Sequence, residues 1–246
     1  MNGVWSCEAI AGKSAEVYQP AGAARPRLGL LFLHPVGNET LRDRPAYTRR
    51  LDELRLACVC PMAPHTWWTD RVLPAFDAKL TAEQHIVKNV VPFFAERWGV
   101  LPRSIGLCGI SMGGQGALRL AFRHPRLFPV AAGIASAFDF HELYGQGYSL
   151  DEMYDSKEQA RQDTAILHID PHDYPPHLFI AIDPEDADWY RGNDRLHEKL
   201  NALGVPHTID FTTSAGGHTW EYFNRMAEPA LRFVVQGLEK ESRRLL

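Results

Sequence analysis

One serine, Ser111, stands between closely spaced glycines in the stretch SIGLCGISMGGQGALRL, residues 104–120. The apolar run over residues 105–110 predicts a buried strand, and the pattern after Met112 predicts a helix. Ser111 therefore lies on a strand-to-helix turn, within the pattern G-x-S-x-G. Such a turn exposes the serine hydroxyl as a nucleophile and leaves the backbone N–H of Met112 free to bind an oxyanion.

A serine hydroxyl becomes a good nucleophile when a histidine takes its proton and a carboxylate orients that histidine. Among the eleven histidines, His218 follows the last predicted strand and precedes the last predicted helix, in the segment TTSAGGHTWEYF. The glycine pair before it allows the loop to place the imidazole over the carboxyl edge of the sheet. His218 is therefore the expected base, and His34, at the end of an earlier strand, is expected to be structural.

The acid should come from the loop after the preceding strand, in HLFIAIDPEDADWYRGN, residues 177–193. Three aspartates compete there, namely Asp183, Asp186 and Asp188. Asp183 ends the strand and the other two lie in the loop, so position alone does not choose among them. Their spacing matches no calcium loop, and we predict no metal site.

A second oxyanion donor is expected from the loop after the strand that enters the centre of the sheet, in LFLHPVGNET. Pro35 has no N–H to donate. The next two residues can donate, and we take the N–H of Val36 as the donor beside that of Met112.

Aromatic residues near the carboxyl ends of the predicted strands are candidates for the substrate pocket. Such rings bind an apolar or aryl acyl group or the face of a sugar, although packing beneath a cap explains them equally well. The candidates are Trp67, Trp68, Trp189 and Trp220. If the chain is extended at the Trp67-Trp68 pair, only one of the two needs to be buried.

Strand-like and helix-like patterns alternate along the whole chain. After an N-terminal hairpin, strands are expected over residues 28–34, 57–64, 105–110, 130–134, 177–183 and 207–213. Helices are expected over residues 47–56, 83–98, 193–203 and 220–238, and after Ser111. This alternation predicts an α/β fold whose central, mostly parallel sheet is flanked by helices on both faces.

The length and charge of the chain limit its organisation and its partners. The 246 residues are most simply one domain, 1–246, and the sequence allows a small lid around residues 138–175. The net charge of -4 gives no electrostatic case for binding nucleic acid or an anionic membrane. We see no secretory signal pattern and no membrane-spanning run, so we expect a cytoplasmic protein. Homo-oligomerisation is left open.

Together these residues resemble the α/β-hydrolase superfamily, and within it the group that includes esterase D, the S-formylglutathione hydrolases and the feruloyl esterases. The resemblance covers about residues 28–233 and is strongest in GISMGGQGAL and GGHTWEYF. The group's pattern of an aspartate two residues before an aromatic residue selects Asp188, before Tyr190, with Asp186 in reserve. The chain departs from the group at Pro35, where many relatives carry glycine.

The resemblance implies an α/β-hydrolase fold and a serine carboxylic ester hydrolase that needs no cofactor. Ser111 would attack the acyl carbonyl, His218 would transfer the proton, and Asp188 would hold the imidazole. The N–H groups of Met112 and Val36 would bind the oxyanion. The expected partner is a small-molecule ester, for example an aryl or carbohydrate-linked ester. The alternatives are a thioesterase or acyltransferase with the same triad, and a noncatalytic binding protein on the same fold.

Overall fold

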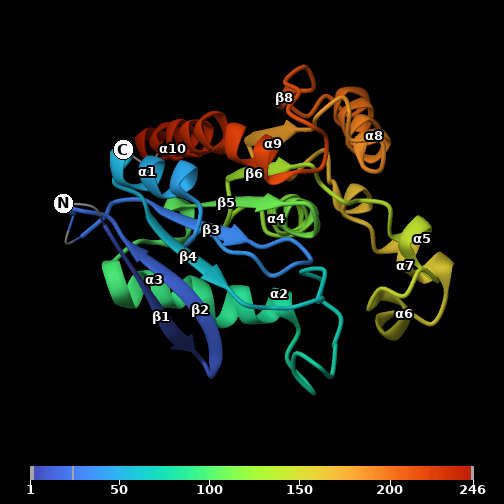
Figure 1. Ribbon diagram of the computed structural model, residues 1–246, viewed down its shortest axis with the longest axis horizontal. Helices are drawn as coiled ribbons and strands as arrows, with labels where there is room; N and C mark the ends of the chain where they lie inside the picture. Colours follow the sequence, from blue (N-terminus) through green and yellow to red (C-terminus); the bar gives the residue numbers. More distant parts are fainter. Residues whose placement is uncertain (1–2, 24, 245–246) are drawn as a thin grey trace.

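The computed structural model describes residues 3–23 and 25–244. Within them an eight-stranded sheet has the order β1-β2-β4-β3-β5-β6-β7-β8 (Figure 1). The strands are β1 (Val4–Ile10), β2 (Lys13–Gln19), β3 (Gly29–Leu33), β4 (Ala57–Pro61), β5 (Ile105–Ile110), β6 (Val130–Ile134), β7 (His177–Ala181) and β8 (Thr208–Asp210). Strand β2 is antiparallel to both of its neighbours, and every other neighbouring pair is parallel. The mostly parallel sheet expected from the sequence is confirmed.

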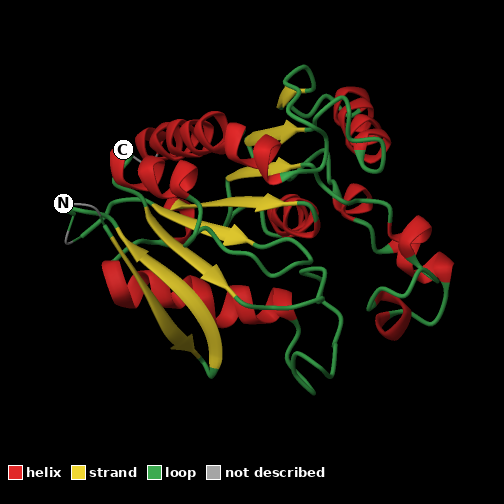
Figure 2. Cartoon of the chain, viewed as in Figure 1, coloured by secondary structure: helices red, strands yellow, loops and turns green. Residues whose placement is uncertain are grey.

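Helices cover both faces of this sheet, as Figure 2 shows. One face packs against α2 (Ala82–His85), α3 (Val91–Trp98) and α4 (Met112–Arg123). The other face packs against α1 (Pro45–Glu53), α9 (Trp220–Arg225) and α10 (Ala227–Arg244). Residues of β3 alternate between the two cores, because successive side chains of a strand point to opposite faces. Within the described ranges, no helix is both long and apolar enough to cross a membrane.

The long helix predicted over residues 83–98 is interrupted in the structure. A π-helical turn, Ile86–Val90, separates α2 from α3. Pro92 lies just after this turn and has no N–H to donate to the carbonyl of Lys88, so the regular α-helical hydrogen-bond pattern is broken here although the helix continues to Trp98. The last predicted helix is likewise divided, into α9 and α10.

The segment over residues 138–175, which we call the 138–175 segment, lies beyond the carboxyl ends of β5 and β6 (Figure 1). It contains α5 (Phe140–Leu143), α6 (Leu150–Met153), α7 (Lys157–Gln162) and a 3-10 turn, Ala165–His168. Several of its apolar side chains are fully buried, among them Phe138, Phe140 and Leu150. The segment is therefore packed onto the sheet domain rather than merely solvated. Two expectations stay predictions. One is that this segment acts as a lid, and the other is that the chain forms a single domain.

Candidate active site

Ser111 occupies a strained turn between β5 and α4. Its backbone has φ 56° and ψ -118°, a conformation that side-chain-bearing residues rarely adopt. The Ser111 N–H donates to the carbonyl of Ile134 (2.9 Å), and the Ser111 carbonyl accepts from the N–H of Ala137 (3.1 Å). The hydroxyl caps no backbone N–H of α4. These bonds hold the turn on both sides and leave the hydroxyl for another partner.

The glycines around Ser111 are required by close backbone contacts. A Cβ atom on Gly109 would overlap the carbonyl oxygen of Gly113, and one on Gly113 would overlap the carbonyl oxygen of Leu33. A Cβ atom on Gly116 would lie 2.6 Å from the Cβ atom of Trp68. The glycines thus allow the first turn of α4 to pack directly against β5 and against the loop that follows β3.

His218 lies between the hydroxyl of Ser111 and the carboxylate of Asp186. Its Nε2 is 3.0 Å from Ser111 Oγ, and its Nδ1 is 2.7 Å from Asp186 Oδ2. A neutral imidazole that donates from Nδ1 to the carboxylate has its Nε2 lone pair free to accept the serine proton. The ring also packs edge-to-face on Phe223 at 5.1 Å and lies 6.0 Å from the ring of Trp189.

Asp186 is fixed by the turn that leads from β7 into α8 (Tyr190–Ala202). Its Oδ1 accepts from the N–H of Trp189 (3.2 Å), while Oδ2 faces His218. The side chain is buried. Both carboxylate oxygens are therefore hydrogen-bonded, which fixes the direction in which Asp186 holds the imidazole.

Asp183 holds the histidine loop through backbone contacts. Its carboxylate accepts from the N–H groups of Glu185 (2.8 Å), Ala215 (2.6 Å) and Gly217 (2.9 Å). Burial alone would raise the pKa of Asp183, but these hydrogen bonds outweigh it and lower the pKa below its ordinary value. Gly217, at φ 72°, comes directly before His218. Asp183 thus joins the loop that carries the base to the loop that carries the acid.

The structure corrects the choice of Asp188 as the acid. Asp188 is exposed, whereas the buried Asp186 meets His218. The pattern of an aspartate before an aromatic residue therefore selected the wrong carboxylate, and the reserve choice is the one in contact. The reason is the tight turn after Asp183, in which the N–H of Asp186 donates to the Asp183 carbonyl (3.0 Å) and directs Asp186 back toward the sheet.

The two expected oxyanion donors belong to segments that touch. Gly113 packs against the backbone of Leu33 and His34, so the loop after β3 begins beside the first turn of α4. Within residues 3–23 and 25–244, neither the Met112 N–H nor the Val36 N–H donates to another protein group outside regular helix or strand bonding. Met112 is the first residue of α4, where an N–H has no acceptor within the helix.

Pro35 begins a tight turn after β3. Its carbonyl accepts from the N–H of Asn38 (3.0 Å) and from Nδ1 of His34 (2.7 Å). The other ring nitrogen of His34, Nε2, accepts from the N–H of Ala63 (3.1 Å). His34 is thus a neutral, fully buried structural residue, and burial lowers its pKa to about 4.

Both Trp67 and Trp68 are buried, contrary to the expectation that only one would be. The chain is not extended there, because both residues have positive φ values, 51° and 54°. Trp68 donates from Nε1 to the carbonyl of His34 (3.2 Å) and packs on Gly116, so it supports the loop after β3. Trp67 instead packs against two aromatic rings of the 138–175 segment.

The other two pocket candidates lie in different surroundings. Trp189 and Trp220 are both half-buried. Trp189 lies beside His218, whereas Trp220 lies beneath the guanidinium of Arg44, 3.5 Å from the ring centre. Sequence reasoning did not anticipate Phe223, whose ring lies nearer to that of His218 than the ring of Trp189 does. Phe223 follows His218 by five residues, near the start of a predicted helix, and this position could have indicated that its ring lies beside the histidine.

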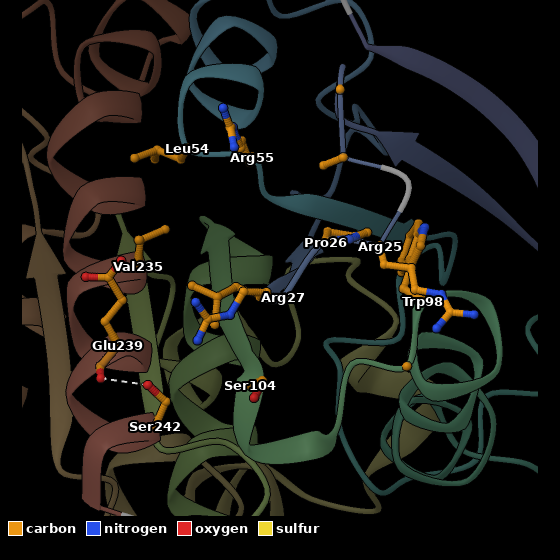
Figure 3. A pocket seen from close by; sticks show the side chains of 14 residues that line it. Arg25, Pro26, Arg27, Leu54, Arg55, Trp98, Ser104, Val235, Glu239 and Ser242 are labelled. Carbon is orange, nitrogen blue, oxygen red and sulfur yellow. Dashed lines mark hydrogen bonds between the residues drawn. The ribbon is translucent and has the colours of Figure 1, made fainter. Parts of the chain in front are cut away.

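A cavity of about 810 Å³ lies at the opposite edge of the sheet (Figure 3). Its lining includes Leu28, which precedes β3, and Ser104, which precedes β5. The length of β5, six residues or about 20 Å, separates this edge from Ser111. The labelled residues of this cavity are Arg25, Pro26, Arg27, Leu54, Arg55, Trp98, Ser104, Val235, Glu239 and Ser242. The cavity is therefore not part of the Ser111 site.

Comparison with known families identifies the family of the chain. The family model described as "Putative esterase" matches residues 68–233, two thirds of the chain. The chain belongs to this family. It is accordingly an enzyme of the carboxylic ester hydrolase class, and the resemblance found in the sequence is confirmed. A search of curated proteins finds no significant match to the sequence.

Solved structures of esterases share the fold over nearly their whole length. A fluorophosphonate-binding serine hydrolase of Staphylococcus aureus is 17% identical, with a TM-score of 0.80 over 96% of this chain and 99% of that one. A ferulic acid esterase is 16% identical, with a TM-score of 0.78 over 96% and 100%. An S-formylglutathione hydrolase from Agrobacterium tumefaciens is 15% identical, with a TM-score of 0.75 over 97% and 100%. These similarities show the α/β-hydrolase fold.

Proposed function

We propose that this esterase hydrolyses a small-molecule ester with Ser111 as the nucleophile, His218 as the base and Asp186 as the acid that orients it. The observation that carries the proposal is the continuous hydrogen-bonded line from Ser111 Oγ through the imidazole to Asp186 Oδ2, with distances of 3.0 and 2.7 Å. A serine, a histidine and a carboxylate in this order can carry out acyl transfer through a covalent intermediate.

In the proposed mechanism the Ser111 hydroxyl attacks the ester carbonyl while Nε2 of His218 takes its proton. The imidazolium is stabilised by Asp186 and then gives the proton to the leaving alkoxide, which departs as the alcohol. Water, deprotonated by His218, attacks the acyl-enzyme in the second half of the reaction. Proton return to the serine releases the carboxylic acid and restores the enzyme.

We assign the oxyanion to the backbone N–H groups of Met112 and Val36. Two features support this assignment. Met112 is the first residue of a 12-residue helix, whose N-terminal dipole favours negative charge. The loop that carries Val36 begins in contact with the same helical turn, through Gly113.

Our proposal for the substrate class is based on the family and on the aromatic residues around the site. An aryl or carbohydrate-linked ester is our proposal, because Trp189 and Phe223 flank His218 and Trp220 begins α9, the helix that contains Phe223. The ferulic acid esterase among the similar structures is consistent with an aryl ester. A small-molecule partner and a cytoplasmic location are expected from the sequence alone.

The experiment that tests this function is hydrolysis of a panel of p-nitrophenyl and aryl esters by the wild type, Ser111→Ala and His218→Ala. We expect turnover by the wild type and a loss of at least about 10³-fold in kcat for each variant. Equal turnover by the wild type and Ser111→Ala would show that the serine is not the nucleophile. Thioesters in the same panel separate an esterase from a thioesterase.

A further inference from the structure

The cavity at the amino ends of β3 and β5 (Figure 3) has the size of a small-molecule binding site. Its volume is about 810 Å³, and pockets that bind small molecules usually measure about 300–1,000 Å³. Leu28 and Ser104, which precede the two strands, line it together with residues from the ends of α1 and α3 and from α10. The cavity lies at the edge of the sheet opposite Ser111, so a ligand here would be separate from the ester substrate.

The charges on the lining of this cavity are mostly positive. Arg25, Arg27 and Arg55 line it, and Glu239 is the one carboxylate side chain among the lining residues that the structure describes. The lining therefore carries three positive charges and one negative charge, although the whole chain has a net charge of -4. This distribution favours an anionic ligand.

Arginines near this edge differ in whether they have an acidic partner. Arg97 lies 3.6 Å from a carboxylate oxygen of Glu8, and Arg103 lies 2.9 Å from one of the buried Glu241. Neither of these arginines is among the lining residues. Over residues 3–23 and 25–244, the three arginines that line the cavity form no ion pair and no side-chain hydrogen bond. The cavity arginines are therefore the ones left available to a ligand.

A buried proline holds two of the cavity arginines in the loop after β2. Pro26 is buried, whereas Arg25 and Arg27 on either side of it are exposed. The pyrrolidine ring fixes φ of Pro26 and also restricts the backbone of the residue before it. Figure 3 shows Arg27 between Glu239 on one side and Trp98 on the other. The loop thus presents two guanidinium groups from a backbone of restricted conformation.

Arg55 occupies a backbone conformation that favours glycine. It follows α1 with φ 51°, and its N–H donates to the carbonyl of Asp52 (3.0 Å), while the N–H of Leu56 donates to that of Leu51 (2.9 Å). These two bonds form a Schellman motif, in which glycine is the usual residue at this position. An arginine here costs conformational strain, which points to a role for its side chain.

The dipole of α1 explains only part of this charge. The carboxyl end of a helix has a partial negative charge, which accounts for one cation directly after α1. It does not account for the other two cavity arginines, because they belong to the loop after β2. Like charges that gather around one cavity repel one another, and an anion that binds between them relieves this repulsion.

A phosphate group matches these donors better than a single carboxylate does. A guanidinium can donate two parallel N–H bonds to phosphate oxygens. A phosphate monoester carries a charge of about −1.5 to −2 at neutral pH, so it balances more of the positive charge than one carboxylate can. The cavity is much larger than a phosphate ion, which leaves room for an organic group attached to it.

We propose that this cavity is a second binding site of the protein, for a small molecule that carries a phosphate group, and that Arg25, Arg27 and Arg55 bind the phosphate. The site lies away from Ser111, so the inference goes beyond the proposed function and does not depend on it.

The test is isothermal titration calorimetry of the full chain at fixed ionic strength. The probe is inorganic pyrophosphate, and sodium acetate is the singly charged comparison. We expect saturable binding of pyrophosphate to the wild type and at least about tenfold weaker binding to Arg25→Gln and to Arg27→Gln, because each loses charge-assisted hydrogen bonds. Acetate should bind far more weakly.

Arg55→Gly separates a binding role from a structural one. Glycine adopts the backbone conformation of this position without strain, so the Tm of the variant without ligand should not fall below that of the wild type. Its affinity for pyrophosphate should nevertheless fall at least about tenfold.

The matched control is Arg97→Gln, which removes the same charge at the same edge of the sheet but outside the cavity lining. Its affinity for pyrophosphate should stay within about twofold of the wild type. Ser111→Ala should also bind pyrophosphate like the wild type, so failure of the proposed function leaves this test intact.

Three results would overturn the inference. The first is the absence of saturable binding to the wild type. The second is an equal loss of affinity in Arg97→Gln and in the cavity variants, which would indicate a general effect of charge. The third is equal affinity for acetate and pyrophosphate, which would remove phosphate as the recognised group.

Discussion

At the scale of single residues, the hydrogen-bonded line from Ser111 through His218 to Asp186 is complete. Each polar side-chain atom in it has a hydrogen-bond partner. The serine hydroxyl meets Nε2, Nδ1 meets one carboxylate oxygen, and the other oxygen accepts from the N–H of Trp189. A buried carboxylate is costly unless it is hydrogen-bonded in this way. The arrangement fixes one tautomer of the imidazole and aims it at the serine.

Asp186 and Asp188 give a direct residue-level prediction. Asp186→Asn should lower kcat for a p-nitrophenyl ester by about 10²–10⁴-fold, because the amide no longer stabilises the imidazolium or its tautomer. Asp188→Asn, at an exposed position two residues away, should stay within about twofold of the wild type. Steady-state kinetics of the pair decide the question, and a larger loss in Asp188→Asn would contradict the structural assignment.

The role of the Val36 N–H can be tested with a pair of substitutions at one position. Val36→Pro removes the N–H and should lower kcat by about 10²–10³-fold, the usual loss for one oxyanion donor. Val36→Ala keeps the N–H and should retain most of the activity. Thermal melting of both variants serves as the folding control. Full activity in a folded Val36→Pro would remove Val36 from the oxyanion site.

Sequence reasoning singled out Ser111 and His218 through their glycine-rich surroundings, and the structure brings the two together, but it preferred Asp188, whereas Asp186 is the aspartate in contact with His218. The carboxylate that meets the imidazole is set by Asp183, which accepts hydrogen bonds from its own loop and from the separate loop before His218. No local sequence pattern encodes these contacts between the two loops. The burial of Arg119 was also missed. An arginine in an amphipathic helix is usually exposed, and here its partner Asp163 is 44 residues away.

At the scale of elements, the close packing of β5, α4 and the loop after β3 positions the site. Strands β5 and β6 were predictable with their bounds, because continuous apolar runs mark strands that are buried on both faces. The interruption before α3 and the division of the last helix were not anticipated. For the 138–175 segment the sequence allowed only a small lid, and it did not show which of the segment's apolar side chains are buried.

The packing at the start of α4 predicts a strong effect of Gly113→Ala. The added Cβ would overlap the backbone of Leu33, which has no flexible end to move aside, so we expect a loss of about 1–3 kcal/mol in the free energy of unfolding and a large loss of turnover. Gly99→Ala is the control. It sits at φ 74° in open space and should cost only about 1 kcal/mol with turnover preserved. Urea denaturation and kinetics measure both, and a benign Gly113→Ala would contradict the described packing.

At the scale of the whole molecule, several buried ionisable groups link folding to pH. Burial lowers the pKa values of His34 and His85 to about 4, from an ordinary value of 6.5. Between these values the unfolded chain binds protons that the folded protein does not, so stability falls as the pH falls from 6.5 to about 4. Asp163 and Asp183 have lowered pKa values, and their contributions are lost mainly below about pH 4.

We therefore predict a pH-dependent loss of stability that belongs to His34. Between pH 7 and pH 4.5 its contribution to the free energy of unfolding should fall by about 2 kcal/mol, since one unit of pKa shift corresponds to about 1.4 kcal/mol. Urea denaturation of the wild type and His34→Gln at both pH values measures this. The free energy of unfolding of His34→Gln should change less with pH than that of the wild type, whatever the stability of the variant at pH 7. Equal slopes would show that folding does not lower the pKa of His34.

The most direct test of the central claim is the reaction of the protein with a fluorophosphonate, followed by intact-mass measurement and peptide mapping. This reagent phosphonylates a serine that a neighbouring base activates. The account predicts one adduct, located on Ser111, absent in Ser111→Ala and formed far more slowly in His218→Ala. An adduct on another residue, or equal labelling of the wild type and Ser111→Ala, would contradict the assignment of Ser111 as the activated nucleophile.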